Sequence, residues 1–184
     1  MTIELVSYAD IKAFVGLEET GITEYPSLGV IQSSVVEAIE TYLCRSLEYG
    51  AYTQSIQVMG QTSIIGLDAL PVDSIESVTV TQYGEDTALN TDDYFITEYG
   101  IYLYAPVSMC RLAIEYDGGY TTSTIPGAIK RAALLQTIFE FQTKDNVGAS
   151  SVSTDGGSVQ TPELGLLKEV KRLLNPFKHQ LAWS

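Results

Sequence analysis

Hydrophobic positions recur every three or four residues near both ends of the chain, whereas in the middle they alternate with polar positions. The first pattern predicts helices over residues 7–16, 27–47, 125–144 and 161–175. The second pattern covers residues 52–117, which are rich in β-branched and aromatic residues and are interrupted by frequent turns. We therefore expect an α+β fold: a small helical bundle, with three main helices plus a short N-terminal helix, and an inserted antiparallel β-sheet of five to six strands.

The predicted helices carry recognisable start signals. Ser7 is placed to cap the first helix, and Asp10 stands at the third helical position, where a carboxylate completes a capping box. Ser27 is the expected cap of the second helix, Thr124 that of the third and Thr161 that of the last. These signals support four separate helices.

The helix expected over residues 125–144 is apolar around a wide arc. Ile129 lies on its main stripe, and Leu134, Ile138 and Phe141 extend the apolar surface around the side. A helix with so wide an apolar arc is packed on several sides. The neighbours that cover it belong either to the same chain or to an adjacent subunit.

Acidic pairs in the β region are the nearest approach to a metal site. Glu85 and Asp86 form one pair, and Asp92 and Asp93 form another. Calcium binds such oxygen ligands. Both pairs nevertheless stand beside residues that favour turns, where acidic side chains are common, so we interpret them as turn residues. The tyrosines, twelve in the whole chain, fit half-buried strand surfaces.

The stretch at 145–160 is rich in glycine and serine and carries little charge. Its composition predicts the most mobile part of the chain. Long loops of this kind are either plain linkers or elements that contact a partner. In the second case the contact residues would be Val147, Val152 and Val159.

The C-terminal tail carries three large apolar side chains, Phe177, Leu181 and Trp183. Apolar anchors at a chain end suit docking into a pocket of a partner. The alternative is that the tail folds back onto the protein's own core, as Phe and Leu commonly do.

Composition and charge narrow the possible functions. The chain is 45% hydrophobic, enough for a substantial core, and contains neither a long apolar run nor a recognisable signal peptide. We expect no membrane segment. The net charge of −13 argues against a protein that binds nucleic acid through its phosphates. The acidity serves either solubility alone or a surface that does not adhere to DNA.

Catalytic and metal-binding motifs are missing from the sequence. There is no phosphate-binding loop, and the one histidine, His179, has no second histidine or cysteine pair nearby. Cys44 and Cys110 are expected to be buried reduced thiols, with a single disulfide as the alternative. We therefore expect no enzyme activity, no cofactor and no metal.

Six short sequence segments, here called phrases, occur in order along the chain: AIETYLCR at 38–45, LPVDSIESVTV at 70–80, DY at 93–94, IEYDGGYT at 114–121, IPGAIKRAALL at 125–135 and LLNPF at 173–177. Together they resemble the head–tail connector family of tailed phages, also called head completion or adaptor proteins. The resemblance covers nearly the whole chain. The last phrase has Phe where the family has Tyr, and residues 17–27 and 145–160 match nothing particular in the family.

The resemblance implies a structural protein of the virion neck, assembled in the host cytoplasm. It implies a single connector domain over residues 1–184, with helical parts at 1–50 and 120–184 and a β insertion at 51–119. About twelve copies would form a ring that joins the portal protein to a tail-side neck or tail terminator protein. Genomic DNA would pass through the ring's channel without specific binding.

The same resemblance suggests roles for the residues singled out above. The tail residues Phe177, Leu181 and Trp183 would dock on the portal, and the wide apolar arc at 125–144 would pack laterally between subunits. Three other functions remain open from the sequence. One is a tail-side stopper or terminator protein, and another is a carbohydrate- or protein-binding β module built on the tyrosine-rich strands. The third is an enzyme with an acidic site at Asp92 and Asp93.

Overall fold

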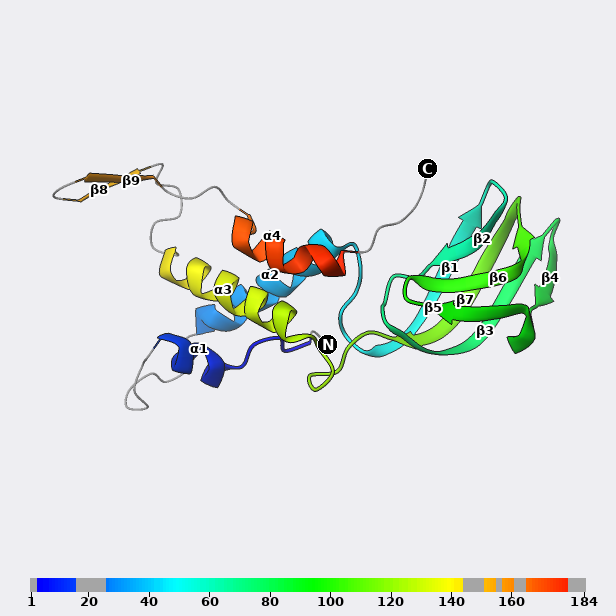
Figure 1. Ribbon diagram of the computed structural model, residues 1–184, viewed down its shortest axis with the longest axis horizontal. Coiled ribbons are helices and arrows are strands. Elements are labelled where there is room, and N and C mark those ends of the chain that lie inside the picture. Colours follow the sequence, from blue (N-terminus) through cyan, green and yellow to red (C-terminus); the bar gives the residue numbers. More distant parts are fainter. Residues whose placement is uncertain (1–2, 16–25, 144–150, 155–156, 161–164, 179–184) are drawn as a thin grey trace. The chain divides into compact units, whose positions relative to one another are not determined.

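The computed structural model describes residues 3–15, 26–143, 151–154, 157–160 and 165–178 (Figure 1). The chain divides into two compact units. The helical unit is formed by Thr2–Tyr42 and Ile125–Phe177, and the main part of the β unit is Leu43–Thr124. The expected α+β class is confirmed.

The helical unit contains the helices α1 (Tyr8–Val15), α2 (Pro26–Leu43), α3 (Gly127–Thr143) and α4 (Lys168–Leu174), and a 3-10 turn over Asn175–Phe177 follows α4. Apolar side chains from the segment before α1 and from all four helices are buried. The most deeply buried are Val35, Ile39, Ile129, Ala132, Ala133, Val170 and Leu174.

The first predicted cap is confirmed, whereas those expected for the second and third helices differ from expectation. The Ser7 backbone N–H donates to the Asp10 carboxylate at 3.0 Å, and the Asp10 N–H donates to the Ser7 hydroxyl at 3.2 Å. Ser27 lies inside the first turn of α2, because that helix begins at Pro26. The Thr124 hydroxyl accepts from the Thr121 N–H at 2.9 Å, so it closes a tight turn instead of capping α3.

Two helices are shorter than the hydrophobic pattern predicts. α2 ends at Leu43 because Cys44 adopts a φ of 55°, which ends the right-handed helix. α4 begins at Lys168, since Gly165 has a φ of 125° and Leu167, at the cap position, makes no side-chain capping bond. Thr161 lies outside the described residues. The bundle therefore has two long and two short helices.

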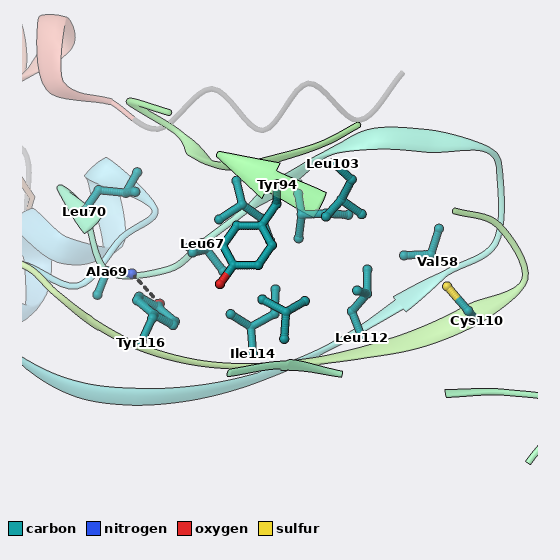
Figure 2. Packing of buried hydrophobic residues seen from close by; sticks show 13 residues of the cluster. Val58, Leu67, Ala69, Leu70, Tyr94, Leu103, Cys110, Leu112, Ile114 and Tyr116 are labelled. Carbon is teal, nitrogen blue, oxygen red and sulfur yellow. Dashed lines mark hydrogen bonds between the residues drawn. The ribbon is translucent and has the colours of Figure 1, made fainter. Parts of the chain in front are cut away.

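The β unit consists of two antiparallel sheets. In the first sheet the strand order is β1 (Gly50–Val58), β7 (Cys110–Gly118), β3 (Val72–Gln82) and β4 (Glu85–Ala88). In the second sheet the order is β2 (Thr62–Gly66), β6 (Gly100–Val107) and β5 (Tyr94–Thr97). One hydrophobic cluster draws on both sheets, so they pack face to face; it includes Val58, Ile65, Val78, Tyr94, Ile101, Leu103, Leu112 and Ile114 (Figure 2).

The β unit thus has seven strands in two sheets, whereas a single sheet of five to six strands was expected. The strand missed was β4, so Glu85 and Asp86 stand on an edge strand and the interpretation of this pair as turn residues was wrong. The turn is formed by the two preceding residues, Tyr83 and Gly84, whose φ angles of 54° and 86° suit a two-residue hairpin. Asp93 does lie in a turn, in a 3-10 segment where its carboxylate accepts from the Asn90 N–H at 2.7 Å.

A buried tyrosine connects the core to the loop between β2 and β3. The Ala69 N–H donates to the Tyr116 hydroxyl at 3.0 Å (Figure 2), and that hydroxyl lies 3.3 Å from the Gln54 side-chain oxygen. The same Gln54 oxygen accepts from the Asp68 N–H at 3.0 Å. Burial raises the pKa of Tyr116, so its phenol stays neutral.

Candidate interaction surfaces

The wide apolar arc of α3 is covered largely by the helical unit itself. Ile129 and Ile138 are buried, whereas Leu134 and Phe141 are half-buried. The expectation of packing on several sides is therefore met at least in part within the chain. Lateral packing of Leu134 and Phe141 against another subunit stays a prediction.

The predicted docking tail is described only at its start. Phe177 is half-buried at the end of the 3-10 turn, while Leu181 and Trp183 lie outside the described residues. The turn is fixed to α2, because the Tyr42 hydroxyl donates to the Asn175 side-chain oxygen at 2.9 Å. The chain therefore leaves the helical unit from a defined point.

The glycine- and serine-rich stretch contains secondary structure that its composition did not predict. β8 (Ser151–Thr154) pairs with β9 (Gly157–Gln160) in an antiparallel hairpin. Val152 is the Cα partner of Val159, so two of the three predicted contact residues are neighbours. Val147 lies outside the described residues.

Gln136 is a buried polar residue that the sequence reasoning missed. Its amide nitrogen donates to the Gly165 carbonyl at 3.2 Å and to the Glu140 carboxylate at 2.9 Å. Its amide oxygen accepts from the Leu167 N–H at 3.0 Å. The side chain thus fixes the segment before α4 onto α3. The available signal was the amide of Gln136 itself, which stands among the apolar positions of the predicted helix.

The outer side of the three-stranded sheet carries a cluster of aromatic and aliphatic side chains, here called the aromatic face: Ile64, Phe95, Tyr102 and Tyr104. The Phe95 ring centroid lies 5.0 Å from that of Tyr102 and 5.5 Å from that of Tyr104. Ile64 and Phe95 are the Cα partners of Tyr102 on either side. Ile64 is 57% exposed and Tyr104 is 63% exposed, so this surface is open to solvent within the chain.

Charge distinguishes the two outer sides of the β unit. Strands β2, β5 and β6, which the structure describes in full, contain no charged residue. The outer side of the four-stranded sheet instead carries Arg111 and Glu115, and the Ser77 hydroxyl donates to the Glu115 carboxylate at 3.0 Å. The outer side of the four-stranded sheet is therefore polar, whereas that of the three-stranded sheet has the composition of an interface core.

Exposed apolar side chains also mark three connections between strands at one end of the β unit. Met59 follows β1, Tyr83 follows β3 and Met109 precedes β7, and all three are largely exposed. The strand register brings these connections to the same end, where the Gln82 side-chain nitrogen donates to the Ser108 carbonyl at 3.0 Å.

Negative charge is concentrated in the β unit. Leu43–Thr124 contains eleven acidic residues against two arginines and no lysine, a net charge of −9 (2 − 11) out of −13 for the chain. Two of these carboxylates act on neighbouring tyrosines. A hydrogen bond to Asp73 raises the pKa of Tyr49, and a hydrogen bond to Glu98 raises the pKa of Tyr99. Both phenols remain neutral at physiological pH.

The described residues offer little for catalysis or metal binding. Among them no group of three or more His, Cys, Asp or Glu side chains is placed to hold a metal ion. A cavity of about 240 Å³ in the helical unit is lined mainly by apolar side chains such as Val36, and its polar lining residues are Glu4, Gln32, Ser33 and Thr137. None of the helices in the described part of the chain has the length and apolar character of a membrane span.

The two cysteines are not joined to each other. Cys110 is buried, as expected, and burial raises the pKa of its thiol. The expectation that Cys44 is also buried was wrong, because the backbone turns outward with a positive φ at the end of α2 and exposes the side chain.

Neither a protein-family model nor a curated protein sequence matches this chain. Its structure is nevertheless similar to solved ones. A chain from the neck of an empty GTA particle, computed with C6 symmetry, is 15% identical with a TM-score of 0.60, over 92% of this chain and 87% of that one. A chain from the virion of the native gene transfer agent (GTA) particle is 14% identical with a TM-score of 0.60, over 92% of this chain and 87% of that one.

A third chain, from the neck of the native GTA particle computed with C12 symmetry, is 14% identical with a TM-score of 0.55, over 83% of this chain and 82% of that one. At these identities the likeness shows the fold. The chain therefore has the fold of a particle neck protein, with both its units included in the match. This agrees with the connector resemblance of the sequence phrases.

Proposed function

We propose that this chain is a structural subunit of a virion neck, a head–tail connector that forms a ring of about twelve copies between the portal and the tail. The observation that carries the proposal is the likeness to GTA neck chains over 92% of the sequence, because a match of that length takes in both the helical unit and the β unit. The phrases at 38–45 and 114–121 support it independently.

The charge supports a second part of the proposal, that DNA passes through the ring without being bound. Twelve β units with a net charge of −9 each present a strongly negative surface. Like charge keeps phosphates from adhering to the wall of a channel. A connector must let the genome slide through in both directions, and an acidic unit without lysine serves this requirement.

Docking on the portal is assigned to the tail, and lateral contact to the helical unit. Phe177 starts the tail from a turn fixed on α2, and Leu181 and Trp183 follow it in the sequence. Leu134 and Phe141 are the predicted α3 residues with surface left to bury. The hairpin that pairs Val152 with Val159 is the proposed contact element for a further partner.

Co-expression with the portal protein of the same genome tests the proposal. The purified particle should be heavier than the bare portal by about twelve chains of 20.1 kDa. A chain with Leu181→Ser and Trp183→Ser should fold and leave the portal bare. A control with His179→Ser and Gln180→Ser, in the same segment, should load normally.

A portal that emerges bare from the wild-type co-expression would contradict the connector role. A tail-side stopper or terminator would then be tested by binding to the tail proteins of the same genome. Saturable quenching of tyrosine fluorescence by an oligosaccharide would instead indicate a binding module that uses the tyrosine-rich strands.

A further inference from the structure

We propose that the aromatic face is the contact surface for the β unit of a second copy of this chain. The inference rests on the proposed function, since it names the surface through which neighbouring subunits of the ring meet. It starts from the contrast between the two outer sides of the β unit, one uncharged and aromatic, the other hydroxylated and charged.

The aromatic face has the chemistry of an interface core. Phe95, Tyr102 and Tyr104 form a contiguous ring cluster, and Ile64 extends it across β2. Aromatic side chains gain most from burial, and tyrosine keeps its hydroxyl for a hydrogen bond at the rim. The outward positions of the four-stranded sheet are instead occupied by polar pairs. One example is the Ser74 hydroxyl, which donates to the Asp117 carboxylate at 3.2 Å.

The proposed ring makes a second copy the occupant, and charge indicates which surface of the β unit it contacts. Two β units that each carry −9 repel one another, and burying an unpaired carboxylate between them is costly. A surface without any charged residue is where like-charged subunits approach at the lowest cost. Of the two outer sheet sides, only that of β2, β6 and β5 meets this condition.

The complementary surface on the second copy is the outward row of β1. Thr53, Ser55 and Gln57 are exposed, uncharged and able to hydrogen-bond with tyrosine hydroxyls. Gln57 and Thr53 are the Cα partners of Arg111 and Glu115 on β7, so one guanidinium and one carboxylate border the row, and a guanidinium is attracted by aromatic rings. The edge strand β4 is a poorer choice because it carries Glu85 and Asp86.

The two surfaces lie on opposite sides of the β unit. The sheets pack face to face, so the outward side chains of the first point away from those of the second. A contact between two different surfaces of identical chains repeats from copy to copy and forms a ring when the rotation closes, or an open filament when it does not, whereas a surface that meets itself stops at a dimer. The proposed pair of surfaces therefore suits a ring.

Charge variants test whether the aromatic face is buried on assembly. Tyr104→Glu adds a carboxylate at an exposed strand position, and Thr87→Glu on β4 is its matched control. Both isolated chains should melt like the wild type. After co-expression with the portal, Tyr104→Glu should reduce the number of chains per portal at least tenfold, and Thr87→Glu should leave it unchanged.

Cysteine cross-linking tests the choice of partner surface. In a Cys44→Ser background, one chain carries both Tyr104→Cys and Ser55→Cys, and two others carry one change each. Oxidation of portal-bound rings should give a ladder of covalent oligomers from the double variant and none from either single variant. A dimer from Tyr104→Cys alone overturns the assignment of the β1 row, because the aromatic face then meets itself.

The outcomes separate this inference from the function on which it rests. If the wild-type chain does not load onto the portal, the proposed function fails and the inference fails with it. If the wild type loads and Tyr104→Glu loads equally well, the neck role stands and the aromatic face is not a subunit contact.

Discussion

The guanidinium of Arg45 lies 5.5 Å from the centre of the Tyr120 ring, and one of its nitrogens is 3.5 Å from the Tyr120 hydroxyl. The two residues belong to separate sequence phrases, 38–45 and 114–121, that the β unit brings together. The Arg45 Nε is buried and has no hydrogen-bond partner, so the ring provides much of the environment of this cation.

Replacing Arg45 should therefore destabilise the β unit beyond the effect of removing a surface charge. We expect Arg45→Ala to lower the free energy of unfolding by about 1–2 kcal/mol, through the lost ring contact and the lost packing of its stem. Urea denaturation of the isolated chain measures this. Arg111→Ala, an exposed arginine of the same unit, is the control, and equal effects from the two would contradict the role assigned to Tyr120.

Gly119 should be intolerant of any side chain. It has a φ of 99°, and a Cβ there would overlap the carbonyl of Glu48. Gly119→Ala should thus lower the free energy of unfolding by more than about 2 kcal/mol, from strain and clash together. Gly60→Ala, where a Cβ has open space, should change stability little. Similar melting temperatures for both variants would show that the backbone around Gly119 and Glu48 can shift to accommodate a Cβ.

Removing the Tyr116 hydroxyl should leave the buried Ala69 N–H without its acceptor. We expect Tyr116→Phe to cost about 1–3 kcal/mol of stability, the usual penalty for an unsatisfied buried donor. Tyr83→Phe serves as the control, because Tyr83 is 93% exposed at its hairpin turn. Thermal melts of both variants decide the point; no difference between them would mean that another group, such as water, satisfies Ala69.

The amide of Gln136 should hold the start of α4 in place. Gln136→Leu preserves size but removes the acceptor for the Leu167 N–H and the donor to the Gly165 carbonyl. Amide hydrogen exchange at Leu167 should accelerate at least tenfold, with a loss of about 1–3 kcal/mol in stability. Gln142→Leu, at an exposed position of the same helix, should leave that exchange rate unchanged.

The two thiols should differ sharply in reactivity. Cys44 is exposed, whereas Cys110 is buried with its pKa raised by that burial, so less of it is thiolate at any pH. A thiol reagent at pH 8 should modify one cysteine per native chain and two per denatured chain. Cys44→Ala should abolish the native reaction, and persistence of that reaction would show that Cys110 is accessible.

The sequence was most informative where a residue acts on its immediate neighbours. The capping box of Ser7 and Asp10 is local, and the pattern alone predicted it. Strand β4 was not predicted because Glu85–Ala88 has no alternation of apolar residues. Its pairing with β3 depends on the turn at Tyr83 and Gly84. The early end of α2 likewise depends on the positive φ of Cys44, which its residue type does not announce.

The candidate surfaces were less predictable, because they depend on which strands become neighbours. Ile64 precedes Phe95 and Tyr102 by more than thirty residues, and only the order β2-β6-β5 places the three in one row. Alternation within each strand indicates an outward side but not what lies beside it. The role of Gln136 was hidden for the same reason, since its partners are about thirty residues away.

The segments that lead into and out of the β unit lie side by side. The Tyr120 N–H donates to the Leu47 carbonyl at 2.6 Å, and the Tyr49 N–H donates to the Tyr120 carbonyl at 3.0 Å. A segment whose two ends are hydrogen-bonded to each other is a transplantable cassette: it can be cut out at one place and closed with a short linker, or exchanged for another without stretching the chain that receives it. The sequence of the inserted segment can thus vary while the helical unit stays unchanged.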